Sequence, residues 1–142
     1  MKLDGQDHRS LALWAADCAG RVLPYFEGEH PGDDRPRRAI EAGQAWARGE
    51  IKVGEARAAA IAAHAAAREV DGAAAPAAAR ATGHAAATAH RAAHARHAAG
   101  YAVRAVAYDA ASAAPEAAVA EERDRQYRRL WEHLRPAVFP AR

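Results

Sequence analysis

Cysteine is nearly absent from this sequence of 142 residues, and the one thiol, Cys18, has no partner for an internal disulfide. The sequence also lacks any run of about 18 uncharged apolar residues, which excludes an ordinary membrane-spanning helix. Its first ten residues, MKLDGQDHRS, have no apolar core of the signal-peptide type. We therefore expect a cytoplasmic chain with no membrane association.

Aromatic residues are scarce as well, at 6% of the chain. Hydrophobic residues nevertheless reach 51%, and about a third of all residues are alanine. The core must therefore be built from small side chains, which favours helices packed at close range. The length corresponds to one domain that can fold alone, and we expect it to cover residues 1–142.

An excess of charge of one sign is missing too. The 20 basic residues are nearly balanced by 18 acidic ones, which gives a formal net charge of +2. Nucleic-acid-binding domains usually carry a much larger basic excess on one face. The composition therefore predicts no nucleic-acid partner.

The first third of the chain predicts two helices. The first covers residues 8–30 with Asp7 as its cap, and Pro24 should kink or restart it. The second begins after Asp34, a good N-cap residue, and ends at Gly49. Pro36 then lies in the first turn, where the missing N–H costs least.

Alanine-rich sequence dominates the middle of the chain. Residues 55–70 predict a third helix, with one stripe formed by Ala58, Ile61, Ala65 and Arg68. Residues 76–111 are too long for one average helix, so we expect two. Their break should lie between about residues 88 and 95, and we place it at residues 90–93. The glycines at 83 and 100 should allow close helix contact rather than end a helix.

The C-terminal part predicts one more helix over residues 112–134. Ser112 is its candidate cap, and Leu130, Trp131 and Leu134 should anchor it. Residues 135–142 should be an extended tail, since Pro136 and a further proline at 140 disfavour helix. No segment alternates with period two, so we predict an all-α fold, a single compact array of five to six antiparallel helices.

The segment TGHAAATAHRAAHARHAAGY, residues 82–101, contains four of the eight histidines. His90, His94 and His97 share one helix face, which Tyr101 extends, and the i, i+4 pair is a spacing that metals use. Three ligands along two turns span about 10 Å, however, which is too far for one ion. A pair completed by His64 or Glu41 is possible, and so is a polar helix face without metal.

His64 lies among alanines and should face the core on one side. A buried neutral imidazole needs a hydrogen-bond partner on each nitrogen, and Asp17 and Glu41 are plausible partners. The sequence leaves two interpretations open. His64 makes a structural hydrogen bond, or it belongs to a polar pocket.

No catalytic residue, metal site or cofactor is predicted. Cys18 lies on the apolar stripe of the first helix, where burial opposes a reactive thiolate. The tryptophans at 14, 46 and 131 are expected to anchor the core. The segment DDRPRR contains three arginines, Arg35, Arg37 and Arg38. They are either solvated at the start of a helix, or one of them forms a buried ion pair or contacts an anionic partner.

Taken together, several segments resemble one family. They are HRSLALWAADCAGRVLPYFE, DDRPRRAIEAGQAWARGEIKV, EARAAAIAAHAAARE, ATGHAAATAHRAAHARHAAGYA and LWEHLRPAVFP. This pattern is similar to the bacterial "putative immunity protein" family with an immunity-five-like domain, over nearly the whole chain. The resemblance implies a small helical protein that binds and blocks a cognate toxin inside the producing cell, without enzymatic activity.

The resemblance also implies a set of recurring polar positions on separate helices. Here they are Trp14, Asp17, Cys18, Arg35, Arg37, Glu41, Trp46, His64, His84, His90 and His94. Such a set keeps a second function open, a small-molecule- or metal-binding pocket of histidines and carboxylates. Our pocket candidates are therefore Trp14, Asp17, Cys18, Glu41, Trp46, His64, His84, His90, His94 and Tyr101. Our candidates for contact with a toxin are Arg35, Arg38, Arg128 and Trp131.

Overall fold

Helices make up most of the chain in the computed structural model, which describes residues 2–111 and 113–139. The six main ones are α1 (Gly5–Glu27), α2 (Arg35–Ala47), α3 (Val53–Arg68), α4 (Ala74–Ala87), α5 (His94–Asp109) and α6 (Pro115–Arg129). A 3-10 turn at Glu132–Leu134 and a short helix α7 (Arg135–Val138) follow. Since the described residues contain no strand, the all-α prediction is confirmed, with six main helices as its upper number.

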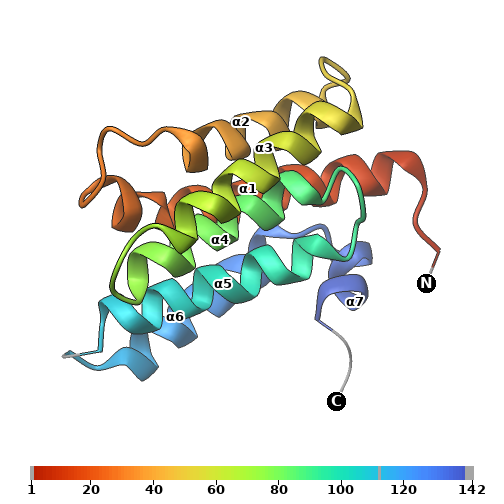
Figure 1. Cartoon of the computed structure of the whole chain (residues 1–142). Helices are drawn as coiled ribbons and strands as arrows, with labels where there is room; N and C mark the ends of the chain where they lie inside the picture. Colours follow the sequence, from red (N-terminus) through yellow and green to blue (C-terminus); the bar gives the residue numbers. More distant parts are fainter. Residues whose placement is uncertain (1, 112, 140–142) are drawn as a thin grey trace.

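The long helices lie side by side in one compact array (Figure 1). Helices α1 and α4 occupy its middle, because α4 contacts α1, α2, α3 and α5, while α1 contacts α2, α4 and α5. The α2–α3 pair covers one side of this centre, and α5 with α6 covers the other. The loop between α4 and α5 lies at the same end of the array as the N-terminus (Figure 1).

Helix α4 shows how an alanine-rich sequence builds a core. Ten of its residues are buried, and they point in every direction around the helix. A helix that is apolar all round is stable only when neighbours cover every side. Many of the larger core side chains, among them Leu11, Trp14 and Phe26, come from α1. Small residues on α4 therefore let other helices approach, and α1 fills the remaining space.

Two glycines mark the closest approaches. A Cβ on Gly43 of α2 would lie 3.2 Å from the backbone oxygen of Ala85 on α4. A Cβ on Gly83 would lie 2.7 Å from ring atoms of His64. The predicted close contact at Gly83 is thus confirmed. At Gly100 the prediction is wrong, because a Cβ there would meet no atom within 4 Å.

Helix α1 begins three residues earlier than the sequence predicts and ends at Glu27, three residues before the predicted end. Its N-cap is Asp4, whose side chain accepts a hydrogen bond from the backbone of Asp7, while Asp7 returns the same interaction. This reciprocal pair satisfies two backbone donors at the helix start. Pro24 does not restart the helix, because α1 runs unbroken to Glu27. Proline removes only one N–H, and that loss is tolerated one turn before the helix end.

The break between α4 and α5 lies at residues 88–93, as predicted. Thr88 ends α4, and its hydroxyl donates to the backbone oxygen of His84. His8 from α1 bonds the backbone oxygen of Thr88. Side chains thus bond carbonyls near the end of α4, and the chain can turn without a proline or glycine.

The C-terminal region differs from the prediction. Helix α6 ends at Arg129, and Arg135–Val138 form helix α7 instead of an extended tail. Pro136 lies in the first turn of α7, where proline fits a helix. Leu130 and Leu134 are buried as expected, but Trp131 is 67% exposed. The candidate cap Ser112 lies outside the described residues.

Large side chains are also exposed on α3. The stripe predicted from Ala58, Ile61, Ala65 and Arg68 is not the buried one, since Ile61 is 62% exposed. The buried residues of α3 are Ala56, Ala60, Ala63, Ala66 and Ala67. Close packing against α4 selects the alanine face, because a branched side chain would hold the helices apart.

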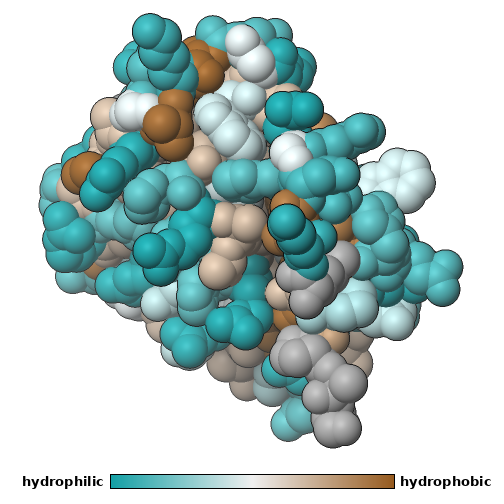
Figure 2. All heavy atoms as spheres, turned by 90° about the vertical axis from the view of Figure 1, so that its right-hand side faces the viewer, coloured by the Kyte–Doolittle hydropathy of each residue, from teal (hydrophilic) through white to brown (hydrophobic). Residues whose placement is uncertain are grey.

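The surface is mostly polar. Figure 2 shows a face covered largely by hydrophilic residues, with hydrophobic ones scattered among them. Among the described residues, no helix is long and apolar enough to cross a membrane.

Candidate functional site

Four histidines and a tyrosine meet where α3, α4 and α5 pack together. We call His64, His84, His94, His97 and Tyr101 the histidine cluster. His84 lies at its centre, with ring centroids 4.9 Å from His64, 5.1 Å from His94 and 5.3 Å from His97. The Tyr101 ring stacks on His84 at 5.2 Å, with only 9° between the ring planes. Three helices therefore contribute to one continuous set of rings.

The chain turn after α4 brings these rings together. His84 lies one turn before the end of α4, and His94 is the first residue of α5. The turn at residues 88–93 places their Nδ1 atoms 2.9 Å apart, so one ring donates a hydrogen bond to the other. His64 reaches the cluster from α3 because Gly83 has no side chain in its way.

Burial favours the neutral form of three of these imidazoles, His64, His84 and His94. It lowers the pKa of His84 to about 3, and the nearby His64, His94 and His97 lower it further. Burial is also the main cause that lowers the pKa of His64, followed by the charges of Arg68 and Arg80. The pKa of His94 is lowered by burial and by His97. At neutral pH each ring can donate one hydrogen bond and accept another.

A pocket of about 470 Å³ opens beside the cluster. Its lining comes from α3, α4 and α5 and consists of Ile61, His64, Arg68, Arg80, His84 and Tyr101. No carboxylate belongs to this lining, whereas both arginines bring positive charge. The chemistry of the pocket therefore suits an anion.

Metal binding requires a different arrangement. Among the described residues, no group of three or more His, Cys, Asp or Glu side chains is placed to hold a metal ion. Neighbouring rings in the cluster face or stack on one another, and the Nδ1 atom of His84 is hydrogen-bonded to His94. The exposed His90 lies in the turn, outside the helix that carries His94 and His97. The helical spacing of these three histidines is thus interrupted.

The other predicted pocket residues lie elsewhere. Asp17 on α1 accepts hydrogen bonds from Arg21 and Arg129, each at 2.8 Å. Glu41 is exposed on α2. The structure therefore gives His64 histidine neighbours in place of these carboxylates.

Two tryptophans and the cysteine have separate surroundings as well. Trp14 is buried and donates from Nε1 to the backbone oxygen of Gln126. Trp46 is half-buried and packs on the ring of His8, with centroids 4.7 Å apart. Cys18 is fully buried, and burial raises the pKa of its thiol to about 12. A thiol with that pKa is a poor nucleophile at neutral pH.

The buried ion pair between Arg21 and Glu122 was not predicted. Glu122 on α6 is only 4% exposed and accepts two hydrogen bonds from Arg21 of α1, at 3.1 and 2.8 Å. Gln126 donates to Glu122 and to the backbone oxygen of Ala99. Burial opposes the charge of Arg21, but Glu122 raises its pKa above the usual value.

We use the name ion-pair seam for the set of five residues that joins α6 to α1, which are Asp17, Arg21, Glu122, Gln126 and Arg129. One signal in the sequence could have revealed the seam. Glu122, Gln126 and Leu130 recur every four residues, and Leu130 is a core residue. Their shared helix face therefore points inward.

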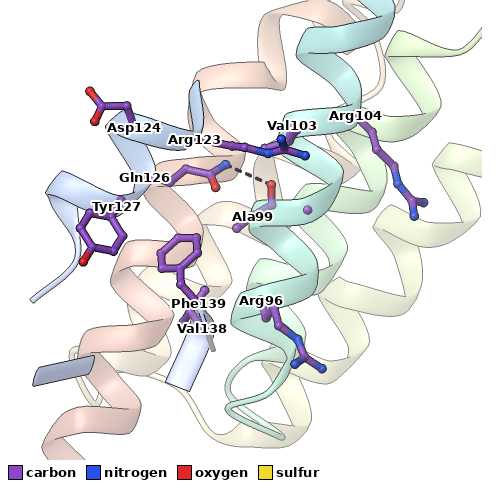
Figure 3. Close-up of a pocket in the computed structure, with 11 residues that line it drawn as sticks. Arg96, Ala99, Val103, Arg104, Arg123, Asp124, Gln126, Tyr127, Val138 and Phe139 are labelled. Carbon is purple, nitrogen blue, oxygen red and sulfur yellow. Dashed lines mark hydrogen bonds between the residues drawn. The ribbon is translucent and has the colours of Figure 1, made fainter. Parts of the chain in front are cut away.

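A second concave region lies between α5, α6 and the C-terminal turn. This groove has a volume of about 800 Å³. Figure 3 shows Phe139 and Tyr127 on one side, and Arg123 reaching from α6 toward Val103 of α5. No residue in this lining was among the pocket candidates. A signal was available, since Arg96, Gly100 and Val103 repeat at three- and four-residue spacing on one helix.

The candidates for toxin contact occupy exposed or partly exposed positions. Arg35 bonds Asp33 and Glu69, Arg38 bonds Asp34, and Arg128 bonds Asp124. Trp131 is exposed, with none of the core contacts expected of an anchor. These positions stay predictions for partner binding.

Comparison with known proteins points to one family. Residues 1–133 match the family described as "Imm-5 like putative immunity protein". Neither the curated proteins nor the solved structures gave a match. Since the family pattern covers all six main helices, the chain belongs to the Imm-5 like putative immunity protein family.

Proposed function

We propose that the chain binds and neutralises a cognate bacterial toxin in the cytoplasm of the producing cell, without enzymatic activity of its own. Membership of an immunity family over residues 1–133 carries this proposal. Immunity by binding needs a surface rather than a catalytic group. Arginine and aromatic side chains supply much of the energy at protein interfaces, and the groove between α5 and α6 offers both.

Co-expression tests the proposal. A candidate toxin, sought among the products of the neighbouring genes, is induced in a sensitive bacterium, with and without the chain. We expect growth to be restored, and the two proteins to co-purify. Loss of growth despite abundant chain, together with no complex, would contradict the proposal.

Stoichiometry separates binding from catalysis. A neutralising protein inhibits its toxin in proportion to the amount added, and protection is complete near one chain per toxin. An enzyme that modifies the toxin protects at far lower ratios. Titration of purified chain against toxin activity distinguishes the two, and protection well below equimolar amounts would overturn the non-enzymatic mechanism.

A second candidate function is binding of a small anion beside the histidine cluster. The pocket with Arg68 and Arg80 favours it, because no acidic side chain in the lining balances their charge. Titration calorimetry with inorganic phosphate, and separately with a small dicarboxylate, tests this function. Binding should be lost in Arg80→Ala and kept in Arg57→Ala, an exposed arginine on α3 outside the pocket.

A further inference from the structure

The groove between α5 and α6 combines an apolar floor with open space. Its floor is formed by Ala99, Gly100 and Val103 of α5 together with Tyr127, Val138 and Phe139. A side chain placed on Gly100 would meet no atom within 4 Å, so the groove is open at this point. A volume of about 800 Å³ is large enough for several side chains of a docked segment.

The rim of the groove is positively charged. Arg96, Arg104 and Arg123 line it, and none of them forms an ion pair with a described residue. The guanidinium of Arg104 lies 4.9 Å from the centre of the Tyr101 ring. Asp124 is the single acid in the lining, and Arg128 already binds it at 2.8 Å. The groove therefore has positive charge to offer to a partner.

The same imbalance extends along α4 and α5. Between Asp71 and Asp109 the sequence contains no acidic residue, but it contains four arginines and four histidines. Several arginines elsewhere are neutralised by neighbouring acids, as Arg37 is by Glu27 and Arg48 by Glu50. A net charge of only +2 thus conceals a long segment, residues 72–108, in which every charged side chain is basic.

We propose that this groove receives an acidic segment of the toxin that carries an apolar or aromatic side chain. Carboxylates of that segment pair with Arg96 and Arg123, since guanidinium groups bind carboxylates in a forked geometry. The apolar side chain lies on the floor against Phe139 and Tyr127. The apolar floor favours a protein segment over nucleic acid. This inference rests on the proposed function and names the surface and the partner chemistry.

A steric variant tests the floor. Gly100→Phe fills the open space, and we expect it to weaken toxin binding by about tenfold or more. Gly20→Phe is the matched control, because Gly20 is also an exposed helical glycine with no atom within 4 Å of a Cβ. The control should bind like the unchanged chain. Circular dichroism and the thermal midpoint show that each variant is folded.

A charge variant tests the rim. Arg96→Glu combined with Arg123→Glu should weaken binding by about tenfold or more and slow association, most strongly at low salt. The control pair Arg9→Glu and Arg57→Glu changes the net charge equally but lies outside the groove. It should keep most of the affinity. Calorimetry and binding kinetics use an inactivated form of the toxin identified by the co-expression test.

The outcomes separate this inference from the proposed function. If the unchanged chain binds and protects, and both groove variants do the same, the toxin docks elsewhere and the inference is wrong. If the unchanged chain neither binds nor protects, the proposed function fails and the inference with it. Dimers that Gly100→Phe abolishes would assign the groove to a second copy, and tight duplex DNA binding would assign the face to nucleic acid. Either result would overturn the inference.

Discussion

The ion-pair seam and the histidine cluster place polar groups inside an alanine core in opposite ways. In the seam, Arg21 and Glu122 carry opposite charges and satisfy each other across α1 and α6. In the cluster, His84 is surrounded by other histidines, and burial keeps its imidazole neutral. The seam fixes the position of α6 against α1. Beside the cluster, positive charge is found in Arg68 and Arg80, which line the adjoining pocket.

Removing one partner of the seam should give the largest effect. Arg21→Met leaves the buried Glu122 with a hydrogen bond from Gln126 and a long ion pair to Arg125 at 4.0 Å, and we expect a loss of about 3 kcal/mol in the free energy of unfolding. Urea denaturation measures this loss. The double variant Arg21→Met and Glu122→Leu should recover much of it, because no buried charge is left unpaired. Equal stability of the single variant and the unchanged chain would disprove the role of the seam.

Crowding the cluster should cost less. In Gly83→Ala the new methyl group collides with the His64 ring at 2.7 Å, so the ring must move, at a cost of about 1–3 kcal/mol. Gly100→Ala is the control, because its methyl group enters open space and alanine favours helix. Thermal unfolding compares the two. A Gly83→Ala variant as stable as Gly100→Ala would contradict the tight contact.

Acid should weaken the histidine cluster. Since the folded pKa of His84 lies far below that of an unfolded histidine, the unfolded chain binds more protons below about pH 6.5. Stability is therefore fully present above that pH and decreases as the pH falls toward 3. Allowing for partial exposure, we expect a loss of about 1–2 kcal/mol between pH 7 and 5.

Denaturation at several pH values measures this dependence. His84→Gln should flatten it, whereas His90→Gln, at an exposed position in the turn, should leave it unchanged. A slope that survives in His84→Gln would assign the proton uptake to other groups.

Breaking a surface ion pair should have the smallest effect. Arg35 makes four side-chain hydrogen bonds with Asp33 and Glu69. Arg35→Ala should nevertheless change stability far less than Arg21→Met does, because solvent screens exposed charges. Thermal unfolding at low and high salt checks this difference. A loss as large as that of Arg21→Met would remove the distinction between buried and exposed pairs.

The sequence predicted the helices better than their environments. The division of residues 76–111 into two helices followed from length, since that segment is too long for one ordinary helix, although length did not by itself place the break at residues 88–93. Ile61 and Trp131 were assigned to buried stripes because large apolar side chains usually are buried. In this molecule close helix contact selects alanine, so the larger side chains are left outside.

The candidate site was predicted in part. His64, His84, His94 and Tyr101 were all named, and the structure brings them together. Their arrangement could not be read from spacing, because the turn removes His90 from the helix. Asp17 shows a second limit. A sequence lists possible partners, but helix packing decides that its carboxylate meets Arg129 and not a histidine.

The single thiol makes opening of the molecule measurable. Cys18 is fully buried one turn from Arg21, so a thiol reagent reaches it only when α1 has separated from its neighbours. Its labelling rate is then the rate of an exposed thiol multiplied by the fraction of open molecules, about 2 × 10⁻⁴ when opening costs about 5 kcal/mol. A toxin that binds the folded chain would slow this reaction further. The labelling rate of one cysteine can therefore report both unfolding and toxin binding.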